Sequence, residues 1–383
     1  MNTTPSSTRH FTSTATSDDI AELPPGHGDR PRAGQQTDAI RRARAAGERA
    51  LVLGGGGGAG NAWEIGVIAG LFDAGLDVTE ADLIIGTSAG STAAAQITSA
   101  ARPDELLASI LAAAPQPRTG PAGSGRGRVP DRPAVDHVAR TGDIIAAAAD
   151  AADMRRRMGA AALAMDAASG SSGPTPRRAV VAARLPSQRW PQRPVLIVAV
   201  DAHTGEPVVF DRHSGVDLVD AVAAARLPSG HWPQRPLLIP AVDAHTGEPV
   251  VFDRHSGVDL VDAVTASCAG PGCPAHSIGG SRYIDGGYRS NENADLAAGY
   301  GRVLVLSPFG GRSRAPLDWG IHLAAQVDEL RARGSRVETI FPDSDSEHMF
   351  GANAMDPSLR PAAARAGYNQ GRALAEQLTD FWR

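Results

Sequence analysis

One serine stands at the centre of a glycine-flanked motif, Gly86-Thr87-Ser88-Ala89-Gly90. The apolar run Leu83-Ile84-Ile85 comes directly before it, and residues that favour a helix follow from Ser91. A strand, a sharp turn and a helix in this order are typical of the nucleophile elbow of serine hydrolases. Gly86 and Gly90 leave room across the turn, and the helix N-terminus favours an oxygen that becomes anionic. The motif therefore predicts that Ser88 attacks an acyl carbonyl.

A run of glycines precedes this motif, between an apolar strand pattern at 50–53 and a helical pattern at 62–74. As Gly55-x-Gly57-x-x-Gly60 it matches a dinucleotide-binding turn, but the next strand pattern, 83–85, is not followed by an acidic residue that could hold a ribose. Backbone N–H groups without side chains can also form an oxyanion hole. Because Ser88 is present, we favour an oxyanion hole as the interpretation of this glycine run.

A third motif, Asp285-Gly286-Gly287, follows the apolar pair Tyr283-Ile284. Alone it is a common turn, but a nucleophilic serine needs a base, and Asp285 can accept its proton. The competing prediction is a triad with a late histidine. His322 falls in a helical pattern, which favours packing, and His348 follows an acidic stretch, which favours the surface. On the residues alone, Asp285 and a late histidine both stay open as the base.

In this order, the three motifs resemble those of the patatin-like phospholipases. The resemblance covers roughly residues 50–380 and includes Gly60, Gly86, Gly90, Gly286 and Gly287 as motif glycines. It implies a three-layer α/β/α fold with a mostly parallel sheet, and a Ser88–Asp285 dyad that hydrolyses fatty-acyl esters of lipids or phospholipids. It also implies an oxyanion hole made by the backbone N–H groups of Gly55, Gly56, Gly57 and Gly58, to which we add that of Ala89. We favour this dyad over the histidine triad because it explains both the glycine run and Asp285-Gly286-Gly287. Many members carry Arg or Lys just before the last glycine of the first motif, where this chain has Ala59.

The elements that must position these residues alternate between strand and helix, which favours a parallel sheet covered by helices. We expect a disordered segment at 1–48, poor in large apolar residues, and a hydrolase domain at 49–383. Within it, residues 101–180 form an expected helical insert, with helices at 106–113 and 144–168 and the character of a lid. Met154, Met158 and Met165 lie near one stripe of the second helix, which indicates core packing rather than a lipid-facing surface.

A tandem duplication lies between Ser88 and Asp285. Residues 183–224 recur almost unchanged as 225–266, and each copy has a strand–turn–strand–helix pattern. We expect only one copy to occupy the sheet. We favour the second, because it leads directly into the segment that ends at Asp285. The other copy would be an extra hairpin at the edge or surface.

Composition narrows the choice of partners. The net charge of −5 gives no electrostatic reason to expect nucleic acid. Two cysteines, Cys268 and Cys273, make neither a disulfide framework nor a zinc site. We see no signal peptide and no apolar run of about 18 residues, so we expect a cytoplasmic protein with at most peripheral membrane contact. Its expected partner is a lipid or acyl-ester substrate, without metal or cofactor, and the oligomeric state stays open.

Overall fold

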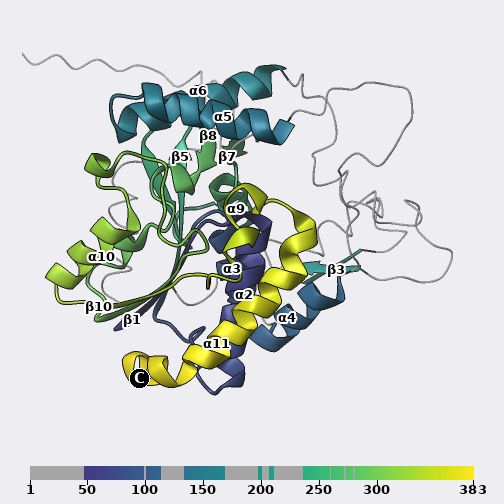
Figure 1. Ribbon diagram of the computed structural model, residues 1–383. Helices are drawn as coiled ribbons and strands as arrows, with labels where there is room; N and C mark the ends of the chain where they lie inside the picture. Colours follow the sequence, from purple (N-terminus) through teal and green to yellow (C-terminus); the bar gives the residue numbers. More distant parts are fainter. Residues whose placement is uncertain are drawn as a thin grey trace, which may run out of the picture.

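The computed structural model describes residues 47–98, 101–113, 133–168, 197–200, 207–210, 236–258, 260–270, 273–278 and 281–383. Most of the segment expected to be disordered, 1–46, lies outside these residues. A central sheet is covered by helices on both faces, and a helix pair lies over one end (Figure 1). In the described part of the chain, no helix combines the length and apolar character needed to cross a bilayer.

The sheet runs in the order β10-β9-β1-β2-β5-β8-β7, with β6 paired to β5 as a branch. The first five strands are mutually parallel, whereas β6, β7 and β8 add antiparallel pairs beyond β2. This mostly parallel sheet confirms the predicted α/β/α class. The strands are β1 (Arg49–Leu53), β2 (Leu83–Gly86), β5 (Leu237–Asp243), β6 (Pro249–Phe252), β7 (His276–Ile278), β8 (Ser281–Asp285), β9 (Arg302–Leu306) and β10 (Arg336–Ile340).

The central strands are apolar on both faces because helices cover both sides of the sheet. In β1, Leu51 and Leu53 pack with the helices of one layer. Ala50 and Val52, which alternate with them, join the cluster of the opposite layer. All four side chains are fully buried, so β1 is a rigid base for the glycine run that follows it.

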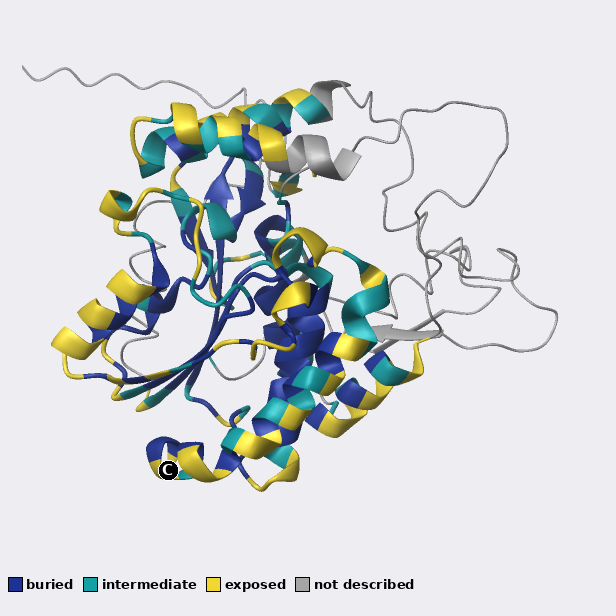
Figure 2. Cartoon of the chain, in the orientation of Figure 1, coloured by how far each residue is buried: buried dark blue, intermediate teal, exposed yellow. Residues whose placement is uncertain are grey.

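One face of the sheet is covered by α2, α3, α4, α9 and α11, and the other by α10 with the short helix η2. Figure 2 shows α2 buried around nearly its whole circumference. The α-helices of these layers are α2 (Gly57–Asp73), α3 (Ala89–Ile97), α4 (Pro103–Ala112), α9 (Leu260–Ser267), α10 (Leu323–Ala332) and α11 (Arg360–Trp382). The 3₁₀ helices are η1 (Gly286–Tyr288), η2 (Ala294–Ala297), η3 (Leu317–Trp319), η4 (Glu347–Met349), η5 (Gly351–Asn353) and η6 (Pro357–Leu359).

Helix α11 packs against α2 at unusually close range. A Cβ atom on Gly66 or Gly70 of α2 would lie 2.2 Å from a carbonyl oxygen of α11. A Cβ on Gly367 or Gly371 of α11 would meet a carbonyl oxygen of α2 at 2.3 or 2.2 Å. Only glycine allows two helix backbones to approach this closely. The C-terminal helix is therefore fixed in register against the helix that carries the glycine run.

The insert differs from its prediction. The helix expected at 144–168 is two helices, α5 (Pro133–Ala147) and α6 (Ala151–Ala168). Asp150 caps the second, because its carboxylate accepts the N–H of Asp153 at 2.7 Å. Met154 and Met158 are 3 % and 5 % exposed and pack against β5 and β8, as the core interpretation of the methionine stripe requires.

The second copy of the duplicated segment supplies β5, β6 and α9 of the main domain. From the first copy, β3 (Ile197–Val200) and β4 (Pro207–Phe210) pair with each other in a separate two-stranded sheet. The helix expected near 218–222 lies outside the described residues. The two copies therefore have different places in the fold despite their near-identity.

Deletion of residues 183–224 should leave a folded protein with ester hydrolysis within about twofold of the full chain, because β3 and β4 add no strand to the main sheet. Deletion of 183–266, which removes both copies, is the control and should abolish folding, because it leaves no segment to form β5 at the centre of the sheet. Circular dichroism, thermal unfolding and ester hydrolysis of both deletions are the measurements. Loss of the fold in the first deletion would show that the extra copy has become structural.

Candidate active site

Ser88 lies at the turn between β2 and α3 in a strained conformation, with φ 51° and ψ −117°. Among the described residues, only one other non-glycine residue has a positive φ. The turn is tight enough to require its glycines. A Cβ on Gly86 would lie 2.5 Å from the carbonyl oxygen of Gly90, and a Cβ on Gly90 would lie 2.1 Å from that of Leu53. Such strain persists only where the surrounding structure imposes it, which is typical of a functional residue.

Asp285 ends β8, and its carboxylate reaches Ser88 across the sheet. Ser88 Oγ donates a hydrogen bond to Asp285 Oδ2 at 2.8 Å, and Asp285 Oδ1 accepts the N–H of Gly287 at 2.7 Å. Gly286 is required beside it, because a Cβ there would lie 2.1 Å from the carbonyl oxygen of Pro240. The residues separated by the duplication therefore meet, and the second bond fixes the carboxylate in its orientation toward the serine.

Burial changes the protonation of this carboxylate. Asp285 is 8 % exposed, and loss of solvation raises its pKa to about 6, against the lowering effect of its bonds from Gly287 and Ser88. Nearby, burial also raises the pKa of Cys268 to about 11, so this thiol is neutral at pH 7. A carboxylate with a pKa near 6 is ionised at pH 7 and is a stronger proton acceptor than an exposed aspartate.

The backbone hydrogen bonds of the glycine run decide which N–H groups remain for a ligand. Gly55 N–H donates to Asn291 O at 2.9 Å, so the prediction that Gly55 contributes to an oxyanion hole is wrong. In the described part of the chain, the N–H groups of Gly56, Gly57 and Gly58 donate to no protein oxygen. They are free because α2 begins at Gly57, five residues earlier than the sequence predicts, and the first N–H groups of a helix lack an intrahelical partner.

A fourth free N–H comes from the other side of the turn. Ser88 N–H is occupied by the hydroxyl of Ser267 at 3.0 Å, whereas Ala89 N–H has no protein acceptor among the described residues. Ala89 begins α3, so this group lies at the positive end of a second helix. Gly60, in contrast, is a packing residue, because a Cβ there would lie 3.1 Å from Pro308.

Several side chains that support the site were not predicted. Ser267 positions the backbone of Ser88, and Cys268 donates its thiol to Ser88 O at 3.0 Å. Asn293 joins the elbow to the segment after Asp285, because its amide donates to Thr87 Oγ1 at 3.0 Å and to Gly286 O at 3.3 Å. Ser267 and Cys268 directly follow the second copy of the duplicated segment, and no spacing rule links them to Ser88.

The two histidines considered for a triad form hydrogen bonds with backbone carbonyl oxygens. His322 is the N-cap residue of α10, and its Nε2 hydrogen bonds with Ala315 O at 2.9 Å. His348 is exposed, and its Nδ1 hydrogen bonds with Asp345 O at 2.9 Å. The residue that hydrogen bonds to Ser88 Oγ is Asp285. This geometry disfavours the histidine triad.

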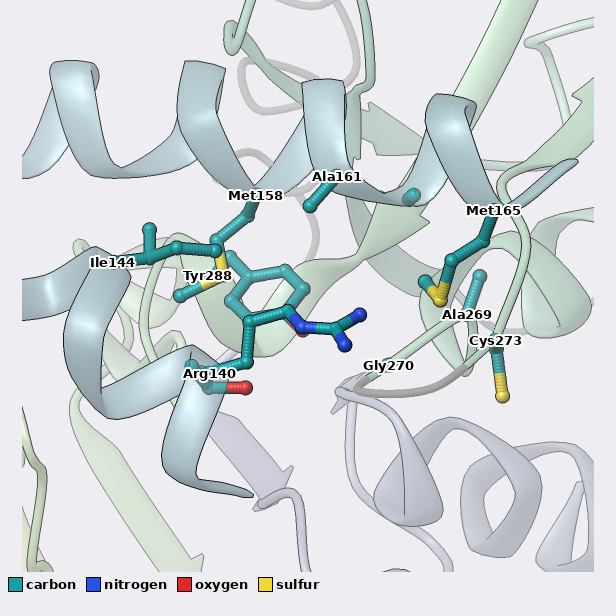
Figure 3. Close-up of a pocket in the computed structure, with 11 residues that line it drawn as sticks. Arg140, Ile144, Met158, Ala161, Met165, Ala269, Gly270, Cys273 and Tyr288 are labelled. Carbon is teal, nitrogen blue, oxygen red and sulfur yellow. The ribbon is translucent and has the colours of Figure 1, made fainter. Parts of the chain in front are cut away.

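A mainly apolar pocket adjoins Asp285 beneath α5 and α6 (Figure 3). Ile144, Met158 and Met165 line it from the helices, and Arg140 extends its guanidinium along it. On the opposite side lies Gly270, where a Cβ would be 2.8 Å from Asp285 Oδ2. The pocket, of about 30 Å³, therefore lies next to Asp285, from which Gly270 separates it.

The sequence model of the patatin-like phospholipase family matches residues 51–298, which include Ser88, Asp285 and the glycine run. This chain belongs to that family. The match confirms the resemblance seen in the motifs, and it shows the general activity of the family, hydrolysis of acyl esters of lipids. No curated protein matches the chain. The family match ends before α10 and α11, so these helices of the patatin-like protein lie outside it.

Proposed function

We propose that this patatin-like protein is a serine acyl hydrolase with a Ser88–Asp285 dyad. The observation that carries the proposal is the 2.8 Å hydrogen bond from Ser88 Oγ to a buried carboxylate, beside four N–H groups that have no acceptor among the described residues. A serine with a base in hydrogen-bond reach is the arrangement that nucleophilic catalysis requires. Free N–H groups nearby are what the tetrahedral intermediate requires.

In the first half of the reaction, Ser88 Oγ forms a bond to the ester carbonyl carbon while Asp285 takes the hydroxyl proton. The carbonyl oxygen becomes an oxyanion and accepts hydrogen bonds from the N–H groups at Gly56–Gly58 and Ala89. The intermediate then expels the alcohol, which leaves with the proton from Asp285. In the second half, Asp285 accepts a proton from water, whose oxygen attacks the acyl-enzyme, and the fatty acid is released from Ser88, which recovers its proton.

The pocket beneath α5 and α6 supports an apolar acyl group as the part of the substrate next to the ester. Methionine, isoleucine and alanine side chains line it together with Arg140, Thr141, Cys273 and Tyr288, and the apolar part favours an alkyl chain through burial of apolar surface. Its volume is about 30 Å³, so α5 and α6 must move outward for a long acyl chain to enter. A separate observation supports peripheral contact with a membrane. Met355 is 77 % exposed and lies beside Gly57 at the glycine run. An exposed apolar side chain next to the site suits a substrate that is presented in a lipid surface.

The proposal is tested by covalent labelling together with an acyl-ester panel of increasing chain length. A fluorophosphonate should add one adduct per chain, mapped by mass spectrometry to the peptide that contains Ser88. The panel should show hydrolysis and a maximum at one range of chain length. An unlabelled protein that binds NADH would support instead the rival proposal, a nucleotide-binding protein that uses the glycine run.

The pH dependence of the wild-type enzyme should report the raised pKa of Asp285. The base must be ionised to accept a proton, so kcat/KM should fall below pH about 6 and reach about one tenth of its plateau at pH about 5. The measurement is kcat/KM for a soluble ester between pH about 4.5 and 9, with circular dichroism as the control for unfolding. An acid limb centred near pH 4 would mean that burial does not raise the pKa of the carboxylate in the working enzyme.

A further inference from the structure

A guanidinium from the C-terminal helix contacts the glycine run. Arg360 is the first residue of α11, and its Nη1 donates to Gly58 O at 2.9 Å and to Asn61 Oδ1 at 3.2 Å. Its Cγ and Cδ atoms also lie 3.9 Å from the position of a Cβ on Gly58. Arg360 therefore contacts the first turn of α2, where the N–H groups of Gly57 and Gly58 have no acceptor in the part of the chain that the structure describes.

The contact fixes one peptide plane of the run from both ends. The Gly58–Ala59 peptide accepts the hydrogen bond from Arg360 at its oxygen and donates its N–H to Ala354 O at 2.9 Å. A glycine backbone has wide conformational freedom, and two bonds to one peptide plane remove most of it. The close packing of α2 on α11 holds Arg360 at the required distance.

Arg360 places a positive charge at a helix N-terminus, which ordinarily favours a negative charge. It lies at the N-terminus of α2, where the partial charge of the backbone is already positive. Burial lowers the pKa of the guanidinium, and no carboxylate in the described ranges forms an ion pair with it. Two like charges without a counter-charge are unfavourable, and an anion at the free N–H groups relieves that cost. A tetrahedral oxyanion is such an anion.

We propose that Arg360 is a positioning residue for the oxyanion hole, which orients the Gly57–Gly58 N–H groups and adds positive charge beside them. The inference rests on the proposed function and extends it beyond the residues that the family model matches. The neighbouring Ala59 is fully buried and apolar and supplies no charge at this place. The C-terminal helix therefore completes a site whose other residues lie before residue 298.

The test compares Arg360→Met, Arg360→Lys and a matched control, Arg365→Met. Arg365 lies on the same helix, is exposed, and has no side-chain hydrogen bond or ion pair with any described residue. For Arg360→Met we expect kcat to fall about 10- to 100-fold, less than the 10²–10³ typical of a lost oxyanion donor, because the donors remain. KM should stay within about threefold, since the charge acts on the oxyanion and not on the ground-state ester. Arg360→Lys should recover part of kcat, and Arg365→Met should match the wild type.

Two further readouts separate this role from a purely structural one. The bimolecular rate of fluorophosphonate labelling should fall together with kcat, while the melting temperature of Arg360→Met stays equal to or above that of the wild type. An unchanged kcat in a protein that still labels at Ser88 overturns the role of Arg360 alone. A fall in the kcat of Arg360→Met also overturns it if Arg360→Lys loses as much kcat and the melting temperature of Arg360→Met is below that of the wild type. A wild-type protein without labelling or hydrolysis overturns the proposed function as well.

Discussion

Replacement of Ser88 by alanine should reduce kcat/KM for ester hydrolysis by a factor on the order of 10⁴ to 10⁶, because nucleophile and base act as a unit. The variant keeps the backbone of the elbow, since the N–H of residue 88 still donates to Ser267 and its carbonyl still accepts the thiol of Cys268. It should therefore fold and bind substrate. The expected loss is in kcat, measured with a soluble ester under saturating conditions, with KM nearly unchanged.

The matched control is Ser109→Ala, which removes an exposed serine hydroxyl that donates to a carbonyl of its own helix. It should retain full activity. Fluorophosphonate labelling should disappear from Ser88→Ala and persist in the control. Hydrolysis by Ser88→Ala at more than about one tenth of the wild-type rate would mean that another group attacks the ester, and the dyad proposal would fall.

The elbow that carries Ser88, the proposed nucleophile, was predictable because its signal is local. The strand at Leu83–Gly86, the turn and the helix from Ala89 lie within one short segment, and the steric demands on Gly86 and Gly90 follow from that turn alone. Asp285 was predictable as the proposed base only together with the serine motif and the glycine run, since Asp-Gly-Gly by itself indicates no more than a turn. The hydrogen bond between the two residues depends on β5, which pairs with β2 on one side and β8 on the other.

Which N–H groups of the glycine run are free for the proposed oxyanion hole could not be read in full from the sequence. Each glycine in the run offers an N–H group, and which of these groups is already paired depends on segments far along the chain. Gly55 was mispredicted because Asn291 accepts its N–H, and Ala59 N–H is paired with Ala354 O. Arg360 was missed for the same reason, since the packing of α11 on α2 brings it to Gly58 across 302 positions of sequence. Tertiary pairing, not local propensity, decides these contacts.

Replacement of Asp285 by asparagine should have two effects of opposite sign, a loss of activity and a gain in stability. Without the base, kcat should fall by about 10²- to 10⁴-fold. Asparagine has nearly the same shape, and its oxygen can still accept the N–H of Gly287. The variant therefore removes the charge while it retains the geometry, and residual activity should lose the acid limb expected of the wild type.

The gain in stability follows from the pKa of the carboxyl group, which burial raises from 3.8 to about 6. A folded-state pKa above the unfolded value favours the folded state below pH 3.8, and this contribution is lost as the pH rises through about 6. The loss corresponds to about 3 kcal/mol of unfolding free energy at neutral pH. Asparagine carries no such cost, so Asp285→Asn should unfold at higher denaturant concentration than the wild type at pH 8, and the difference should shrink toward pH 4.

The control for this effect is Asp295→Asn, which removes a carboxylate that stabilises the fold. Asp295 accepts two hydrogen bonds from the guanidinium of Arg289, at 2.9 and 2.5 Å, so its replacement should lower stability at pH 8. Opposite signs for the two variants would show that the fold tolerates an unfavourable charge at Asp285 because the reaction needs a basic carboxylate there. Equal destabilisation would mean that Asp285 is held as a structural acceptor for Ser88 and Gly287, and the assignment of the base would have to be withdrawn.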